Sequence, residues 1–177
     1  NNKLYCPWAQ GGTSFWDTGN RGATTVGNSN SIPTDDTSTG SGMAAYLESK
    51  YIVIKFAAGN IFTGTYLKTE GTNGVIGFGR PFTAFPTKLA FDYKYKSEQI
   101  NKVGDSAYNY LMGRPDSCNI YVALWHVEDG QYEDFQGEKY PLVIRTKPGK
   151  EQNLFSIDDP RVIAYGQFTQ GKTISDW

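Results

Sequence analysis

Two segments of the sequence place aromatic and hydrogen-bonding side chains in the alternation that a β-strand sorts onto opposite faces. Tyr121 and Trp125 alternate with aliphatic residues, and Asp92 and Lys94 alternate with aromatic residues. Sugars present C–H groups to aromatic rings, and their hydroxyls need planar donors and acceptors. If the fold brings these two faces together, they form a concave carbohydrate-binding surface. The alternative is that both rings belong to the core and are covered by a loop.

Four further residues are candidate ligand contacts, and each has a structural alternative. Arg80 lies between two phenylalanines, where its guanidinium could grip a carboxylate or a pair of hydroxyls, or could pack on the rings. Arg145 points opposite its aliphatic neighbours, and it either joins the polar residues of the proposed binding surface or faces solvent. Trp16 either contacts ligand or plugs the fold from a Gly-rich loop, and Asn20 is either a ligand hook or a turn residue.

Catalytic chemistry finds little support in the residue pattern. Glycoside hydrolysis needs two carboxylates roughly 5 to 10 Å apart, and no strand carries an evident pair. Nucleophilic catalysis would need a histidine beside serine or cysteine, and His126 is the one histidine of the chain. One polar segment is either a solvated connection or a weak calcium site, and its carboxylates are Glu128, Asp129, Glu133, Asp134 and Glu138.

These observations favour non-catalytic binding of an oligosaccharide or polysaccharide, without a cofactor. Calcium is the one ion that the pattern leaves open. A glycoside hydrolase whose carboxylates converge only in the folded chain is the alternative. A third hypothesis is a surface for a protein partner, as in an adhesin, which a tyrosine-rich face would serve equally well.

Composition narrows the class of partner further. The 177 residues carry 17 Lys+Arg and 18 Asp+Glu, a formal net charge of -1, without a long run of either sign. Such a balance argues against nucleic acid and anionic membranes as partners, and no apolar run reaches the length of a membrane-spanning helix. Cys6 and Cys118 lack metal-site spacing, and a buried free thiol is a commoner interpretation of Cys118 than a disulfide between the two.

The elements that must position these residues are β-strands. Aromatic residues make up 15% of the chain, and 20 glycines supply turns between short strands. The predicted strands cover 44–56, 61–67, 87–96, 118–127, 142–146 and 162–168, with a short aromatic-anchored element near Trp16. A helix over 43–50 is the alternative for the first of them. About seven strands without an amphipathic helix between them predict a single all-β domain over 1–177, built as a two-sheet antiparallel β-sandwich.

Four groups of residues, in this order, resemble the family called the putative carbohydrate metabolism domain, which occurs in envelope lipoproteins of Bacteroides and its relatives. They are FWDTGN at 15–20, KFAAGNIFTG at 55–64, GRPFT at 79–83 and DSCNIY at 116–121. The resemblance runs from about Trp8 to Gly166, nearly the whole chain, and the order and spacing of these groups argue against coincidence. No catalytic residues come with the resemblance.

The resemblance implies a jelly-roll sandwich like that of carbohydrate-binding modules, often preceded by a smaller immunoglobulin-like domain. It also implies a place outside the cytoplasm, at the cell surface or in the periplasm, with a lipid anchor in a segment that this sequence does not contain. The pattern over 172–177 is that of a turn entering another strand. We therefore expect the natural polypeptide to continue past Trp177 and to add the last strands of the sandwich.

Overall fold

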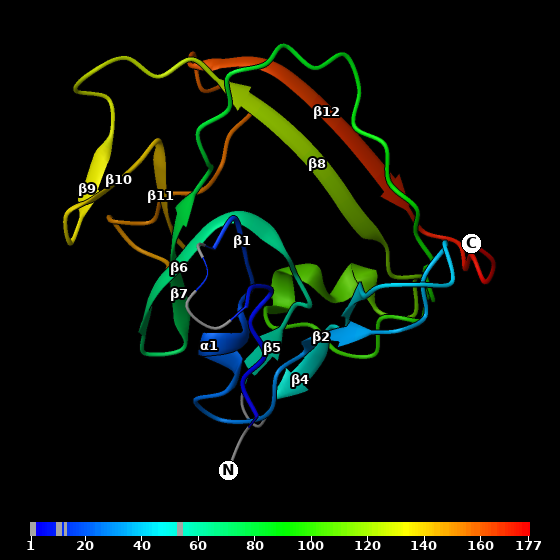
Figure 1. The fold of residues 1–177 in the computed structure, drawn as a ribbon. Coiled ribbons are helices and arrows are strands. Elements are labelled where there is room, and N and C mark those ends of the chain that lie inside the picture. Colours follow the sequence, from blue (N-terminus) through cyan, green and yellow to red (C-terminus); the bar gives the residue numbers. More distant parts are fainter. Residues whose placement is uncertain (1–2, 10–11, 13, 53–54) are drawn as a thin grey trace.

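The computed structural model describes residues 3–9, 12, 14–52 and 55–177, and β-strands dominate it (Figure 1). The strands are β1 (Trp16–Asp17), β2 (Ser31–Thr34), β3 (Ala44–Leu47), β4 (Lys50–Ile52), β5 (Lys55–Ala57), β6 (Phe62–Glu70), β7 (Asn73–Phe78), β8 (Cys118–Trp125), β9 (Glu133–Phe135), β10 (Glu138–Tyr140), β11 (Leu142–Arg145) and β12 (Val162–Gln170). The helices are α1 (Asn20–Ala23) and a 3₁₀ helix at Ser106–Leu111. The prediction of an all-β protein is confirmed.

One four-stranded antiparallel sheet, in the order β1–β6–β7–β11, forms the body of the molecule. The other strands of the described ranges pair in twos, as β8–β12, β2–β3, β4–β5 and β9–β10, and every pairing is antiparallel. These pairings divide the strands among five sheets, and none of the five closes into a barrel.

The four-stranded sheet holds the best-buried apolar side chains. Val75 on β7 and Val143 on β11 are almost fully buried, and the ring of Tyr140 packs with them. That ring lies so close to Gly77 on β7 that a β-carbon at this position would collide with it. β6 and β7 are joined by a tight turn in which Gly71 has a φ of 64°, a conformation that glycine adopts without steric cost.

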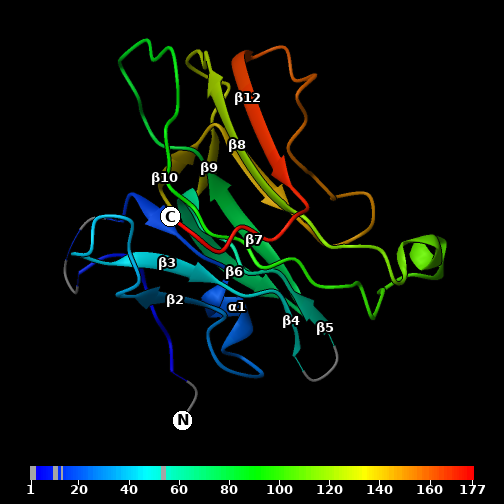
Figure 2. The same ribbon diagram turned by 90° about the vertical axis from the view of Figure 1, so that its right-hand side faces the viewer.

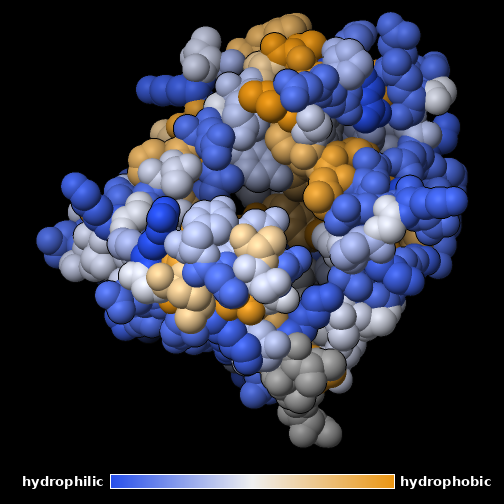
Figure 3. Space-filling view, turned by 180° about the vertical axis from the view of Figure 1, so that it is seen from behind, coloured by the Kyte–Doolittle hydropathy of each residue, from blue (hydrophilic) through white to orange (hydrophobic). Residues whose placement is uncertain are grey.

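β8 and β12 form a long antiparallel ribbon that arches away from the four-stranded sheet (Figures 1 and 2). Its register pairs Trp125 with Val162 at the end where β8 stops. Phe78, the last residue of β7, contacts the rings of both Tyr121 and Trp125, so an aromatic cluster joins the ribbon to the sheet. Seen from behind, the surface is hollowed, and apolar side chains show at the walls of the hollow (Figure 3).

Most of the predicted strands are confirmed. Segments 61–67, 118–127, 142–146 and 162–168 correspond to β6, β8, β11 and β12. The segment 44–56 is not one strand, because it divides into β3, β4 and the start of β5, and its residues 53–54 lie outside the described ranges. The alternative of a helix over 43–50 is wrong, since Ala44–Leu47 is the strand β3.

The predicted strand over 87–96 is wrong for most of its length. Within the described part of the chain, Tyr95 makes the one β-bridge of this segment, with Ile174. Phe91 and Tyr93 instead pack their rings on Phe168 of β12, at centroid distances of 5.6 and 5.2 Å. The alternation therefore identified the face that packs, but a strand also needs a neighbouring main chain to accept and donate its hydrogen bonds.

Candidate functional site

The β8–β12 ribbon sorts its side chains so that one face carries both aromatic rings and neutral polar groups. Its register sets Gln167 opposite Tyr121, and Thr169 opposite Asn119. Residues directly opposite each other in an antiparallel pair point to the same face. The face shared by these side chains, here called the ribbon face, consists of Asn119, Tyr121, Trp125, Tyr165, Gln167 and Thr169.

The aromatic part of the ribbon face is organised around Phe155, which comes from the connection between β11 and β12. The ring of Phe155 stacks on Tyr121 with centroids 5.1 Å apart and planes 20° from parallel, and on Tyr165 at 5.9 Å and 21°. Burial raises the pKa of the Tyr121 phenol, and the nearby Tyr165 adds to this effect. These three rings therefore form a fixed, half-buried platform on the ribbon.

Trp125 lies at the more enclosed end of the same face. Its indole packs edge-on against Phe78, with centroids 5.9 Å apart, and also contacts Phe155 at 5.7 Å. The indole nitrogen is buried and has no hydrogen-bond partner among the residues that the structure describes. Trp125 thus packs between the ribbon and the four-stranded sheet, and Tyr121 extends this packing along β8.

The polar part of the ribbon face is a chain of hydrogen bonds among exposed side chains. The Tyr165 hydroxyl donates to Oε1 of Gln167 at 3.0 Å, and Nε2 of Gln167 donates to Oδ1 of Asn119 at 2.8 Å. The Thr169 hydroxyl also reaches Oδ1 of Asn119, at 3.4 Å. Amides and hydroxyls are the groups that pair with sugar hydroxyls, and this network holds them in place beside the rings.

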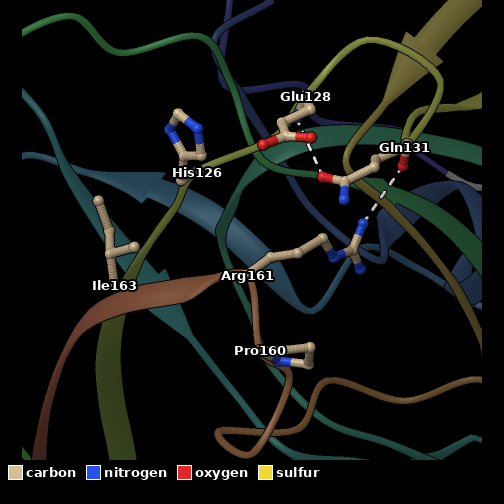
Figure 4. A pocket seen from close by; sticks show the side chains of 6 residues that line it. All are labelled: His126, Glu128, Gln131, Pro160, Arg161 and Ile163. Atoms are coloured by element: carbon tan, nitrogen blue, oxygen red, sulfur yellow. Dashed lines mark hydrogen bonds between the residues drawn. The ribbon is translucent and has the colours of Figure 1, made fainter.

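A pocket of about 290 Å³ lies where the ribbon ends, and its lining is His126, Glu128, Gln131, Pro160, Arg161 and Ile163 (Figure 4). The His126 amide donates to the Arg161 carbonyl at 2.9 Å, which ties the two strand ends together. The Arg161 guanidinium is engaged by Asp159 at 2.7 Å and by the Pro141 carbonyl at 2.7 Å. The hydrogen bonds that Arg161 donates lower the pKa of the Asp159 carboxyl, and the positive charge of the guanidinium adds to this effect.

The chemistry available in this pocket is limited. Glu128 supplies the one carboxylate of its lining, and Asp159 is neutralised by Arg161. A glycosidase needs a second carboxylate to act as nucleophile or base. The pocket is therefore better suited to hold polar groups of a ligand than to cleave a glycosidic bond.

Asp92 and Lys94 do not join the ribbon face. The Ser38 hydroxyl donates to Asp92 at 2.7 Å, and Lys94 forms an ion pair with Asp36 at 2.9 Å. The indole N–H of Trp177 donates to the same carboxylate of Asp36, and the Lys94 ammonium lies 4.8 Å from the centre of the indole ring. These charged residues thus fasten the loop after β2 to the end of the described chain.

Arg80 and Trp16 are brought together beside β1 and β6. Arg80 donates to the Gly64 carbonyl at 2.7 Å and to the Thr65 hydroxyl at 2.6 Å, and a weaker bond of 3.4 Å reaches the Phe15 carbonyl. The ring of Trp16 is 45% exposed and meets Phe15 edge-on at 5.6 Å. Arg80 holds the main chain here, whereas Trp16 presents an aromatic surface to solvent.

Asn20 and Arg145 lie away from the ribbon face. Asn20 is 1% exposed, and its amide donates to the Tyr5 and Ser31 carbonyls while its oxygen accepts from the Asn30 and Ser31 amides. All four hydrogen-bonding positions of an asparagine amide are therefore used. Arg145 pairs with Glu133 at 3.0 Å and, with Glu151, lines a separate hollow of about 390 Å³.

Neither a calcium site nor a disulfide forms among the described residues. Glu133 is engaged by Arg145, and Asp134 accepts a hydrogen bond from the Gly137 amide. In the ranges that the structure covers, no group of three or more His, Cys, Asp or Glu residues is placed to hold a metal ion. Cys6 and Cys118 are both free thiols. Among the described residues, no helix is long and apolar enough to cross a membrane.

Five residues of the ribbon site were not expected from the sequence: Asn119, Phe155, Tyr165, Gln167 and Thr169. Tyr165 and Gln167 alternate within the predicted strand 162–168, so their common face could have been found from the sequence. Their position beside Tyr121 depends on which strand pairs with β12 and in which register, and that information is not local. Phe155 lies in a connection between strands, where alternation says nothing.

Comparison with known protein families identifies the family of this chain. A family model described as "Putative carbohydrate metabolism domain" matches residues 2–177. No curated protein and no solved structure matches the chain.

Proposed function

Because the chain belongs to the putative carbohydrate metabolism domain family, we propose that it is a non-catalytic carbohydrate-binding domain whose ligand lies along the ribbon face. The observation that carries the proposal is the Gln167–Asn119 amide pair, held at 2.8 Å beside the stacked rings of Tyr121, Phe155 and Tyr165. This combination offers a sugar ring both a flat apolar surface and fixed hydrogen-bonding groups.

The proposed ligand is a neutral oligosaccharide or polysaccharide. Asn119, Gln167, Thr169 and Tyr165 form an uncharged network. Arg161, which immediately precedes β12, forms an ion pair with Asp159. A site for uronic acids or sulfated sugars would need a cation with hydrogen bonds to spare.

The wider setting of the proposal follows the family. A jelly-roll sandwich in the natural protein would use the ribbon as part of its second sheet, and a location at the cell surface or in the periplasm, through a lipid anchor, would suit the capture of extracellular glycans. A structure of the native protein would test the jelly-roll sandwich, and cell fractionation would test the location.

The test is binding of the purified chain to an array of neutral and acidic glycans, followed by titration of the best neutral ligand. Gln167→Ala and Asn119→Ala should each weaken binding about fivefold, because each removes a hydrogen bond worth about 1 kcal/mol. Trp125→Ala is a poor probe, because that indole packs between ribbon and sheet.

The matched control is Gln152→Ala, which removes the same side chain from an exposed turn after β11. It should bind as the unmodified chain does, and circular dichroism should show the same fold for all variants. Equal affinities for the unmodified chain, Gln167→Ala and Asn119→Ala would exclude the ribbon face as the site. Release of reducing sugar from a bound glycan would instead favour a hydrolase.

A further inference from the structure

Trp16 and Arg80 lie on the face of the four-stranded sheet that points away from the ribbon. Trp16 pairs with Thr63, so their side chains share a face, and Thr65, two residues further along β6, points the same way. The Thr65 hydroxyl accepts a hydrogen bond from Nη2 of Arg80 at 2.6 Å, which places the guanidinium on this face too. Phe78, which pairs with the residue between these two threonines, points to the opposite face and contacts the ribbon.

The aromatic part of this surface is formed by Trp16 and Phe15. Their side chains belong to residues that are 45% and 47% exposed. The two ring planes lie 72° apart, so the rings meet edge to face and do not stack in parallel. Aromatic surface therefore remains accessible to the C–H groups of a sugar ring.

The guanidinium of Arg80 is held along one edge and open at the opposite corner. Nε donates to the Phe15 carbonyl at 3.4 Å, and Nη2 bonds with the Ser14 hydroxyl, the Gly64 carbonyl and the Thr65 hydroxyl at 2.6 to 3.1 Å. Among the described residues, Nη1 donates to no group. Because a guanidinium is planar, fixing two of its nitrogens also fixes the third. Arg80 thus presents preorganised N–H donors beside the main chain that leads into Trp16.

Positive charge exceeds negative charge around this guanidinium. Burial raises the pKa of the Asp17 carboxyl, and the nearby charges of Arg21 and Arg80 oppose that effect, so two cations act on one carboxyl. In the described ranges neither arginine forms an ion pair, whereas Arg161 is paired with Asp159. Arg80 is therefore a cation with hydrogen bonds to spare, which is what an acidic sugar requires.

We propose that Trp16 and Arg80 form a second binding site, here called the acidic-sugar site, for a saccharide that carries a carboxylate or sulfate group. The sugar ring packs on the Trp16 indole, and an oxygen of the anionic group accepts a hydrogen bond from Nη1 of Arg80. Uronic acids and sulfated sugars share this chemistry. The site is separate from the proposed neutral-sugar site, because the two lie on opposite faces of the four-stranded sheet.

The test is isothermal titration calorimetry of the purified chain with trigalacturonic acid as the carboxylate probe and a κ-carrageenan tetrasaccharide as the sulfate probe. Trp16→Ala should weaken binding of the tighter probe at least tenfold, because the variant lacks the stacking surface. The neutral counterpart of that probe, carboxyl-reduced or desulfated, should also bind at least tenfold more weakly, because its charge-assisted hydrogen bond is lost.

The matched control is Trp177→Ala, which removes the same side chain from a residue that is 44% exposed. It should bind the acidic probes as the unmodified chain does, and so should Gln167→Ala. Arg80→Lys keeps the charge but not the planar fork, and it should weaken binding about tenfold. Circular dichroism checks the fold of each variant, and the comparison of each probe with its neutral counterpart needs only the unmodified chain.

The proposal is overturned if neither acidic probe binds with a dissociation constant below about 1 mM. Equal affinities of Trp16→Ala and Trp177→Ala for the acidic probe would overturn it as well. Tetraglutamate that binds as tightly as the acidic sugars would show attraction by charge alone and would also overturn it. None of these results bears on the ribbon face, which is judged by neutral glycans and by Gln167→Ala.

Discussion

The residues that carry the family resemblance serve mainly to hold main chain in place. In the segment 15–20, Asp17 is 1% exposed and accepts from the amides of Thr18 and Tyr66, both at 2.7 Å. Burial raises the pKa of its carboxyl despite these bonds. The Gly19 amide donates to Asn60, which belongs to the second group of family residues. The two groups of residues thus contact each other, although Gly19 and Asn60 are 41 residues apart.

Asn20 provides the clearest prediction at this scale. Asn20→Ala should lower the free energy of unfolding by about 3 kcal/mol or more, because it strands several buried main-chain groups without partners. Urea denaturation followed by circular dichroism measures the change. Asn28→Ala, at an exposed position, serves as the control and should stay within about 0.5 kcal/mol of the unmodified chain. Equal stabilities would refute the structural role assigned to Asn20.

At the residue scale the sequence could indicate which side chains share a strand face, but not what lies opposite them. The period of two correctly placed Tyr121 and Trp125 on one face of β8. It could not show that Phe155 stacks on Tyr121 or that Gln167 lies opposite Tyr121, because those contacts depend on chain segments more than thirty residues away. Asp92 and Lys94 illustrate the same limit, since their partners Ser38 and Asp36 precede them by 54 and 58 residues.

At the scale of elements, strands form where a neighbour is available to pair with them. β6 and β7 alternate buried and half-buried residues over part of their lengths, and β6, β7 and β11 pair with one another. The segment 87–96 has an equally clear alternation, yet its main chain stays unpaired over most of its length among the described residues. Local pattern was therefore a good guide to burial and a weaker guide to strand pairing, which is decided by the rest of the fold.

Glycines decide how closely the elements approach. Gly77→Ala should destabilise the protein by about 1 to 3 kcal/mol, the usual cost of forcing extra volume into a packed site, because the new methyl group would collide with the Tyr140 ring. The comparison is Gly104→Ala, where a methyl group meets no atom within 4 Å. Thermal melting of both variants measures the difference, and a melting temperature of Gly77→Ala equal to that of Gly104→Ala would contradict the described packing.

At the scale of the whole molecule, the chain divides its apolar contacts unevenly. The cluster of Val75, Tyr140 and Val143 lies within the four-stranded sheet and its neighbour β10. The ribbon depends on the rings around Phe155 on one face and on Phe91 and Tyr93 on the other. Two-stranded sheets are only marginally stable by themselves, so these aromatic contacts determine whether the ribbon stays folded.

This arrangement predicts two levels of protection in native-state hydrogen exchange. Amides of β6, β7 and β11 should open only in global unfolding, whereas amides of β8 and β12 should open with a smaller free energy. A single opening free energy for all five strands would mean that ribbon and sheet unfold as one unit.

The contact of Trp177 with Asp36 joins residues 141 positions apart. During synthesis Asp36 leaves the ribosome long before Trp177 does. The loop after β2 therefore cannot make this contact until β12 has been synthesised. Contacts of such high sequence separation slow the search for the native topology. During that interval Asp36 lacks the hydrogen bond from the Trp177 indole, so this contact can form only late in synthesis.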